Sequence, residues 1–176
     1  CDNEIYDLVK SNNGHAIMTS YNCNTGTERV AEAAKKLDSQ YIILLQGDEP
    51  CFYPSDVEDL ITYINKTQCK FYNIVSPLDK KITLKDVSSV KCSLNQNNDI
   101  TGCFRTTPYI SNFDFQKLFV KKLLGIMCFD RTFLININSL KQSKISSQES
   151  IEQLRLLDNK ILMKAFEVKR DVPSFN

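Results

Sequence analysis

The sequence predicts an α/β fold in which helices flank a doubly wound, mostly parallel sheet. Segments with helical and strand periodicity alternate along the first half of the chain, which is the order typical of such sheets. The unbroken apolar run Tyr41–Leu45 has the length and composition of a central strand buried on both faces. No linker, repeat or low-complexity tract interrupts the chain, so residues 1–176 are expected to form a single domain.

In the first half of the chain, each helix begins at a capping residue and each strand is a short apolar run. A polar side chain just before apolar residues at helical spacing predicts a helix start. In chain order, the expected elements are a helix capped by Asp2 and ended by Gly14, a strand at Ala16–Met18, a helix opened by Thr25 with Glu28, the strand Tyr41–Leu45, a helix opened by Ser55 with Glu58, and a strand at Phe71–Leu78.

The second half of the chain begins with a predicted β-hairpin. Val90, Cys92 and Leu94 alternate with polar residues, and the turn signal Asn95–Asp99 separates them from a second strand at Ile100–Arg105. The elements expected after the hairpin are a strand at Leu123–Phe129, a helix with the apolar face Phe133, Leu134 and Ile137, a helix opened by Ser146 with Glu149 and carrying Ile151, Leu154 and Leu157, and a strand at Ile161–Val168.

Charge and cysteine usage exclude several classes of protein. The chain has 22 Lys and Arg against 21 Asp and Glu, so it has no general attraction to nucleic acid or to a membrane surface. No apolar run approaches the roughly 18 residues of a membrane span, and no secretion signal is visible. Seven scattered cysteines without a C-x-x-C pair, and one histidine, argue against zinc and favour reduced thiols in a cytoplasmic protein.

The segment Gln46–Pro50 is the first candidate for a functional site. It follows the expected central strand at its carboxyl end, where open α/β sheets bind ligands. Two adjacent carboxylates, Asp48 and Glu49, are costly when desolvated without a partner, and Mg²⁺ prefers such oxygen ligands and arrives with nucleotide phosphates. The residues alone fit a metal site and a polar turn with solvated carboxylates equally well.

The segment Asn24–Arg29 is the second candidate, because it precedes a helix N-terminus. Free backbone N–H groups at such an end suit a phosphate, Gly26 permits close approach of the backbone, and Arg29 has the geometry to bind an anion through two hydrogen bonds. A capping box with a surface arginine is the simpler alternative.

Other polar residues have alternative structural roles. Arg105 is a candidate clamp for a carboxylate or phosphate, although most isolated arginines are surface residues. Glu152 and Arg155 are spaced to pair on a solvated helix face. His15 is expected to be a structural or surface residue, and a solvated basic cluster is expected at Lys117, Lys121 and Lys122.

Six segments, in order, resemble the motifs of the CMP-Kdo synthetase family. Gln46–Pro50 is that family's Q-G-D-E-P motif unchanged. The other segments are Gly26–Glu32, similar to S-G-T-[DE]-R-[LV]-A-E without its first residue, which Thr25 replaces; Ser89–Lys91, similar to A-V-K; Cys103–Arg105, similar to F-S-R; Leu124–Ile126, similar to the strand H-[IL]-G-[IV]-Y; and Glu149–Arg155, similar to E-x-L-E-Q-L-R. The ordered set covers nearly the whole chain and is specific, whereas a single match would be weak.

The resemblance implies a nucleotidyltransferase that activates a Kdo-like 2-keto-3-deoxy sugar acid with CTP, for lipopolysaccharide or capsule synthesis. It implies a nucleotide-diphospho-sugar transferase-like fold and a homodimer built on a hairpin and sugar-side lobe at about residues 95–140. It implies that Asp48 is a catalytic Mg²⁺ ligand and that Arg105 is catalytic and pairs with the substrate carboxylate. The remaining implied contacts are Thr25, Gly26, Thr27, Arg29 and Gln46 for the nucleotide, and Glu152 and Gln153 for the sugar acid.

The sequence also departs from the family's motifs. The family opens with a glycine-containing basic loop that cradles the triphosphate, and it ends with a further metal-binding aspartate; neither stands in these 176 residues. The isolated chain is therefore expected to be inactive. Leu123 stands where the family has a sugar-side histidine, and Met127 where it has a tyrosine.

These departures leave three alternatives open. The first is CMP transfer to a related nonulosonic or amino-substituted sugar acid. The second is a non-catalytic chain that forms dimers. The third is a glycosyltransferase-like domain, against which the segments Gln46–Pro50 and Glu149–Arg155 argue.

Overall fold

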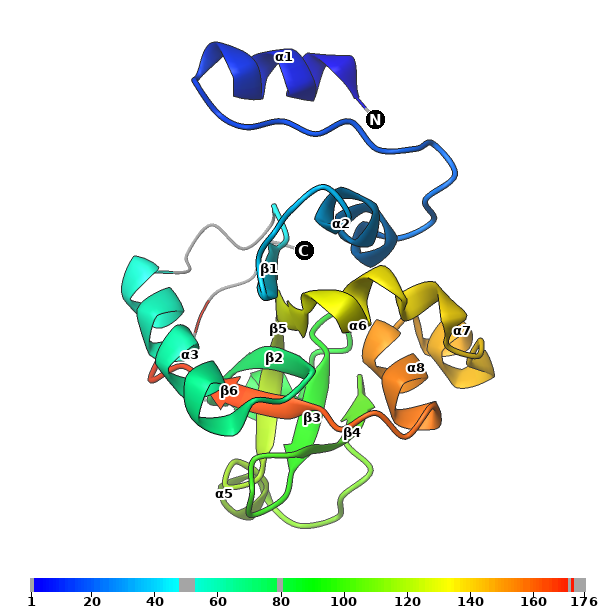
Figure 1. Ribbon diagram of the computed structural model, residues 1–176. Helices are drawn as coiled ribbons and strands as arrows, with labels where there is room; N and C mark the ends of the chain where they lie inside the picture. Colours follow the sequence, from blue (N-terminus) through cyan, green and yellow to red (C-terminus); the bar gives the residue numbers. More distant parts are fainter. Residues whose placement is uncertain (1, 48–52, 79–80, 171, 173–176) are drawn as a thin grey trace.

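The protein folds around a six-stranded sheet with helices on both faces (Figure 1). The structure is a computed structural model that describes residues 2–47, 53–78, 81–170 and 172. The strands are β1 (Tyr41–Leu45), β2 (Phe71–Ser76), β3 (Lys91–Leu94), β4 (Ile100–Phe104), β5 (Val120–Asp130) and β6 (Lys164–Glu167). The described helices are α1 (Asn3–Ser11), α2 (Gly26–Ala34), α3 (Pro54–Thr67), α4 (Lys81–Lys85), α5 (Phe113–Gln116), α6 (Arg131–Ile135), α7 (Lys144–Glu149) and α8 (Glu152–Asp158), with a 3-10 turn, η1 (Ile137–Ser139).

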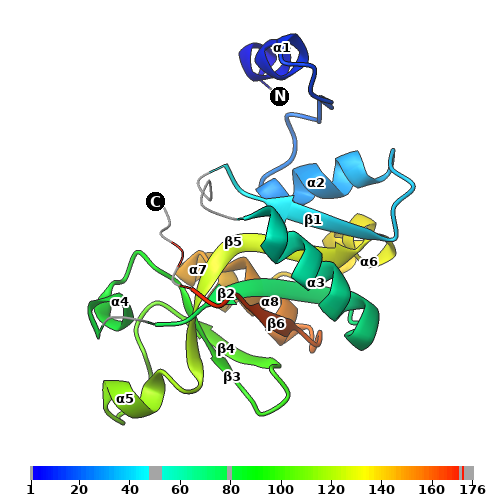
Figure 2. The same ribbon diagram turned by 90° about the vertical axis from the view of Figure 1, so that its left-hand side faces the viewer.

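Strand β5 organises the sheet. Along the path β4-β3-β5-β2-β6, β5 pairs antiparallel with β3 and β2, and β1 also pairs antiparallel with β5 (Figure 2). The α/β class is confirmed, but the pairing differs from the expected mostly parallel pattern. Strands β1, β2, β3 and β6 do run in one direction, yet only β2 and β6 pair in parallel among the described strands. The reason is that β4 and β5 run the opposite way and flank β3, so each pair that they form is antiparallel.

The predicted strand Tyr41–Leu45 is present with the expected bounds, but its position differs. Within the described part of the chain, β1 pairs with β5 alone, so it is not a central strand there. Its side chains alternate, with Ile42 and Leu44 buried and Tyr41 and Ile43 half-buried. The expectation of burial on both faces is therefore wrong. An apolar run cannot distinguish a doubly covered strand from one whose second face is only partly covered.

Two apolar layers hold the helices to the sheet. On one face, Ala31 and Ala34 of α2 and Leu154 of α8 pack in a cluster with sheet residues that include Leu44 and Phe129. On the other face, α3 packs against β2 and β5 through a cluster whose members include Leu60, Ile64, Ile74, Ile126 and Cys128. Each fully buried aliphatic side chain of this kind contributes about 1.5–3 kcal/mol. The sheet is thus covered on both faces, as an α/β fold requires.

Two local expectations are wrong. Residues 16–18 form no strand, because this segment follows α1 outside the sheet, where no strand lies beside it (Figure 1). The single helix expected from Ser146 is two helices, because Ser150 adopts a left-handed conformation with φ of 53°. The cap of α7 is Ser143, whose hydroxyl oxygen accepts the Ser146 N–H. The break places Glu152 in the first turn of a new helix, α8.

The N-terminus of α3 is joined to the chain segment after β6. Arg170 donates to both carboxylate oxygens of Asp56, at 2.9 and 2.6 Å, and its guanidinium lies 3.8 Å from the centre of the Tyr53 ring. Asp56 also accepts the Tyr53 N–H, so the helix begins one residue before the predicted cap Ser55. The hydrogen bonds from Arg170 are the main reason that the pKa of Asp56 lies below its ordinary value.

Replacing Asp56 by Asn is expected to lower the free energy of unfolding by about 1–2 kcal/mol near neutral pH. The lowered pKa means that folded Asp56 stays charged to lower pH than unfolded Asp56 does. Its stabilisation is therefore present above the ordinary carboxyl pKa of about 3.9 and is lost as the pH falls through the lowered value. Urea unfolding at a series of pH values measures this, with exposed Asp59→Asn as the control. If the loss of unfolding free energy in Asp56→Asn stays constant down to the lowest pH, the ion pair with Arg170 does not stabilise the fold.

Candidate active site

A cavity of about 450 Å³ lies where β1 ends, between β5 and the start of α8. Four of the predicted site residues line it: Gln46, Arg105, Glu152 and Gln153. The other lining residues are Ser88, Ser89, Val90, Lys122, Leu123, Leu124, Gly125, Met127, Ser150 and Ile151. The fold therefore brings together segments that are more than a hundred residues apart in the chain.

Arg105 is held at the cavity by backbone oxygens from two segments. Its guanidinium donates to the carbonyls of Val87 and Ser88, both at 3.0 Å, and to those of Glu149 and Ser150, at 3.1 and 3.4 Å. Carbonyl oxygens orient a guanidinium but do not neutralise its charge. Among the described residues, no carboxylate pairs with Arg105, so the positive charge remains for an anionic ligand.

Lys91 supports the same loop from inside the protein. Its ammonium group is fully buried and donates to the carbonyls of Asp86 and Ser89, at 2.5 and 2.7 Å. Burial lowers the pKa of Lys91, and the nearby charge of Arg105 acts in the same direction. Two cations therefore fix the segment that runs into β3 along the cavity.

The first turn of α8 connects the cavity to α2. Thr27 donates its hydroxyl hydrogen to the Glu152 carboxylate at 2.6 Å. A smaller space of about 40 Å³ lies beside this bond, and its lining includes Thr25 and Thr27 as well as Glu152 and Gln153. Glu152 and Gln153 also line the large cavity, so Thr25 and Thr27, predicted for the nucleotide, lie beside the two residues predicted for the sugar acid.

The capping box that opens α2 is present in a modified form. The Thr25 hydroxyl oxygen accepts the Glu28 N–H at 3.1 Å, and the Glu28 carboxylate accepts the N–H of Asn24, not that of Thr25. A side chain added at Gly26 would meet nothing within 4 Å, so no described neighbour requires glycine there. This leaves room above the helix N-terminus.

Arg29 lies apart from the cavity lining. Its guanidinium donates to Thr19 Oγ1 and to the carbonyls of Ser20 and Cys23, at 3.2–3.3 Å. These bonds attach the loop before α2 to the helix. The structure therefore gives Arg29 a loop-holding position, and its predicted nucleotide contact stays a prediction.

Gln46 lies directly over a glycine of β5. Its backbone N–H donates to the Gly125 carbonyl at 3.0 Å, and a side chain at Gly125 would come within 2.4 Å of Gln46 Oε1. Glycine at position 125 therefore lets the Gln46 amide pack against the strand in this rotamer. The sequence motif that contains Gln46 does not reveal this contact, because the two residues are far apart in the chain.

The metal prediction falls on a residue outside the described part of the chain, Asp48. Among the described residues, no group of three or more His, Cys, Asp and Glu side chains could hold a metal ion. The Mg²⁺ expectation therefore stays a prediction that rests on the sequence motif. Over the same residues, no helix has the length and apolar character needed to cross a membrane.

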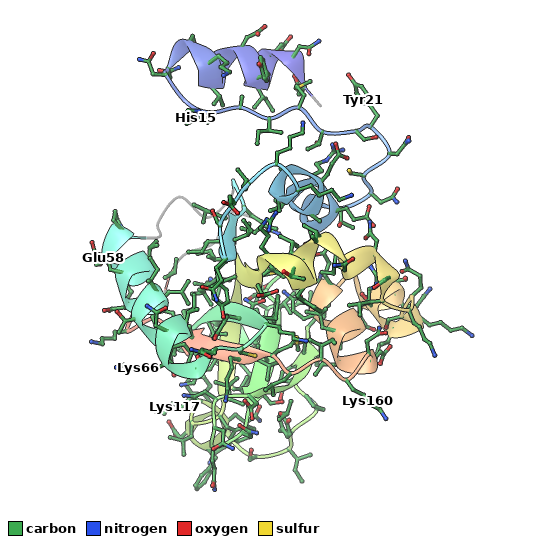
Figure 3. The ribbon with its side chains drawn as sticks, viewed as in Figure 1. His15, Tyr21, Glu58, Lys66, Lys117 and Lys160 are labelled. Carbon is green, nitrogen blue, oxygen red and sulfur yellow. The ribbon has the colours of Figure 1, made fainter. Side chains whose placement is uncertain are left out.

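Lys122 is a site residue that the sequence did not reveal. The expected basic cluster of solvated lysines is wrong at this position, because Lys122 is buried, lines the cavity and donates to the Val172 carbonyl at 2.7 Å. Lys117 forms an exposed ion pair with Asp114, and it projects from the surface, as does His15 (Figure 3). A lone lysine in a strand has no local signal that distinguishes these two environments.

The described cysteines are unsuited to nucleophilic catalysis. Cys23, Cys69, Cys92, Cys103 and Cys128 are all free thiols. Burial raises the pKa of both Cys103 and Cys128 to about 12, so these two stay protonated and unreactive at neutral pH. The site instead consists of cations, amides and a carboxylate.

Two solved structures of low sequence identity share this fold. A glucose-1-phosphate thymidylyltransferase from Bacillus anthracis and a UDP-glucose pyrophosphorylase superimpose with TM-scores of 0.60 and 0.59 at 11% and 12% identity. They cover 95% and 94% of this chain, which in turn covers 63% and 62% of theirs. At this identity the likeness concerns the fold alone.

The chain belongs to the cytidylyltransferase family, whose model matches residues 1–166. It is 31% identical to the Escherichia coli 3-deoxy-manno-octulosonate cytidylyltransferase over 98% of this chain and 70% of that protein. The enzyme of the same name from Protochlamydia amoebophila is 30% identical over 90% of this chain and 64% of its own length. The structure of CMP:2-keto-3-deoxy-manno-octonic acid synthetase complexed with CTP superimposes with a TM-score of 0.88 at 31% identity, covering 99% of this chain and 72% of that one. These relatives confirm the family resemblance, and the chain spans roughly two thirds of their length.

Replacing Thr27 by Val is expected to lower the free energy of unfolding by about 0.5–1.5 kcal/mol, since the Glu152 carboxylate loses a hydroxyl donor while the side-chain shape is kept. Urea unfolding measures the change. Thr62→Val is the matched control, because the Thr62 hydroxyl is exposed and bonds within its own helix. An equal loss of unfolding free energy in both variants would show that the hydrogen bond from Thr27 to Glu152 does not stabilise the fold.

Proposed function

We propose that the protein transfers CMP from CTP to a 2-keto-3-deoxy sugar acid of the Kdo class and releases pyrophosphate. The observation that carries this proposal is the gathering of Gln46, Arg105, Glu152 and Gln153 on one cavity at the end of β1. Family membership and the names of the relatives support the same reaction. The role would be supply of an activated sugar for lipopolysaccharide or capsule.

The cavity offers complementary groups to the two ends of a hydroxylated acid. Arg105 is positioned to bind the substrate carboxylate through its guanidinium, as a planar fork suits that anion. Glu152 is an acceptor for sugar hydroxyls, and Lys122 adds a second positive charge on the wall. Together these groups would hold the anomeric hydroxyl of the acid toward the α-phosphate of CTP, so that catalysis relies chiefly on positioning.

Mg²⁺ is part of the proposal. The Asp48 carboxylate, two residues after Gln46 in the sequence, supplies the oxygen ligand that this ion prefers. When bound, the ion would neutralise phosphate charge during transfer. Thr25, Gly26 and Thr27, at the start of α2, would lie on the nucleotide side, where free N–H groups favour anions.

A related sugar acid is the second candidate substrate. Leu123 and Met127 form an apolar part of the cavity wall, which suits a substrate with fewer hydroxyls on that side or with an acylated amino group. A substrate panel of Kdo, its 8-amino analogue and a nonulosonic acid distinguishes these possibilities by the ratio of kcat/KM values.

Replacing Arg105 by Lys in the product of the complete open reading frame tests the proposal. We expect kcat/KM for the sugar acid to fall by about 10- to 100-fold, because lysine keeps the charge but loses the planar fork. The KM for CTP should change by no more than about twofold, since Arg105 faces the acid. Pyrophosphate release with CTP and Mg²⁺ gives the rates.

Arg131→Lys is the matched control for this experiment, because Arg131 also donates to a backbone carbonyl, that of Ala34, but lies outside the cavity lining. An unchanged kcat/KM for the acid in Arg105→Lys would show that Arg105 does not contact the acid. If the complete protein releases no pyrophosphate with any sugar acid, the chain is a non-catalytic member of the family.

We also infer that the protein is a homodimer in the cytoplasm. The segment between β4 and β5, which contains α5, exposes Ile110, Phe115 and Leu118 at 105%, 61% and 71%. Large apolar side chains exposed so close together in the sequence favour an interface there. The free cysteines of the described residues agree with a reducing compartment.

The double variant Phe115→Asp, Leu118→Asp is expected to be monomeric in light scattering coupled to size exclusion, because two charges would have to be buried at the interface. Ile61→Asp on α3 is the control, since Ile61 is also an exposed apolar residue, at 48%, but lies on another face. A dimer that persists in the double variant contradicts this interface.

A further inference from the structure

Strand β5 bulges opposite a buried asparagine of β2. Asn73 faces Met127 and Val75 faces Leu123, so one residue of β2 lies opposite three residues of β5. Two residues of this stretch of β5, Leu124 and Gly125, line the cavity. A bulge of this kind leaves backbone groups without ladder partners, and such groups need another partner when they are buried.

Asn73 supplies that partner. Its side-chain nitrogen donates to the carbonyls of Leu124 and Ile126, at 3.0 and 3.3 Å, and to that of Ile74 at 2.9 Å. Carbonyl oxygens only accept hydrogen bonds, so the amide NH₂ of Asn73 must face them. The Asn73 side chain is fully buried, and its carbonyl oxygen is thereby turned toward α8.

The orientation of Asn73 determines that of Gln153. Gln153 donates from Nε2 to Asn73 Oδ1 at 2.8 Å, and the same nitrogen lies 3.6 Å from the sulfur of Met127. Both amide hydrogens of Gln153 therefore have acceptors. No group of the described residues donates to Gln153 Oε1, and Gln153 lines the large cavity. The amide can offer a ligand only its carbonyl oxygen.

We propose that Asn73 is a positioning residue that fixes Gln153 as a hydrogen-bond acceptor in the cavity. A ligand must then present a donor at this place, which means a hydroxyl or amino group of the sugar acid and not its carboxylate. The assignment of the ligand rests on the proposed function, whereas the orientation of Gln153 does not. The two ends of the cavity would then differ in what they bind, because Arg105 offers hydrogen-bond donors and Gln153 offers an acceptor.

The experiment compares the wild type with Asn73→Leu in the complete gene product. Leucine has a similar shape but cannot accept from Gln153, so the Gln153 amide is free to rotate. We expect KM for the sugar acid to rise about tenfold, as for one lost ligand hydrogen bond, with KM for CTP within about twofold of wild type. Ser76→Ala is the matched control, since Ser76 is buried in the same strand and its hydroxyl has no described partner.

A second substitution, at Gln153, distinguishes a positioning role of Asn73 from a purely structural one. In a Gln153→Met background, adding Asn73→Leu should leave KM for the acid unchanged, because no amide remains to be oriented. Additive effects of the two substitutions, or an equal rise in KM for CTP, would overturn the proposal. If Asn73→Leu does not fold, Asn73→Ser replaces it, since water can then satisfy the carbonyls of the bulge.

A spectroscopic readout tests the geometry independently of turnover. The side-chain NH₂ of Gln153 in the ¹⁵N-labelled wild type should exchange slowly with solvent and should exchange faster in the Asn73 variants. Fast exchange in the wild type overturns the positioning role. Slow exchange together with no activity toward any sugar acid instead shows that the proposed function has failed while the orientation stands.

Discussion

The bulge in β5 is the constraint on which the site depends. Strand β5 pairs with β1, β2 and β3, so its path fixes where those strands end. Between its pairings with Asn73 and Val75, β5 contains three residues where β2 contains one. Two of these three, Leu124 and Gly125, line the cavity. Bulges are found next to active sites because they redirect side chains without breaking the sheet.

The bulge also connects the two halves of the site. The backbone N–H of Gln46 donates to Gly125 within the bulge, and Gln153 is bonded to Asn73, which holds the carbonyls on either side of that glycine. One short stretch of β5 therefore positions Gln46, which is predicted to contact the nucleotide, and Gln153, which is predicted to contact the sugar acid. A rigid strand positions such groups more precisely than a loop does.

Features with local causes could be predicted from the sequence. The Thr25 cap, the hairpin turn Asn95–Asp99 and the bounds of the strand at Tyr41–Leu45 each depend on neighbouring residues, and each is present. For Arg105 and Glu152 the residues alone left a surface role open, and the family motifs were needed to assign both to one site, since lone charged residues carry little information.

The features that were missed depend on contacts between distant segments. The antiparallel position of β5 beside β1 is decided by the sheet as a whole. The break at Ser150 has no local signal, because serine rarely adopts a left-handed conformation and nothing around it predicts one. Asn73 and Lys122 stand within strands. Asn73 contacts the site through Gln153 and the bulge, whose two sides are about fifty residues apart in the chain, and Lys122 lines the cavity from β5.

The left-handed turn at Ser150 has a physical account through Arg105. The conformation is costly for a non-glycine residue, and it persists where surrounding bonds stabilise it. Arg105 donates to the carbonyls of Glu149 and Ser150, on both sides of the turn, while it also binds the loop before β3. The same guanidinium therefore stabilises the break that begins α8, and so places Glu152 and Gln153, while its charge faces the cavity without a described carboxylate. Folding fixes this cation before a ligand arrives, so an anionic group that binds there meets a donor set that needs no further ordering.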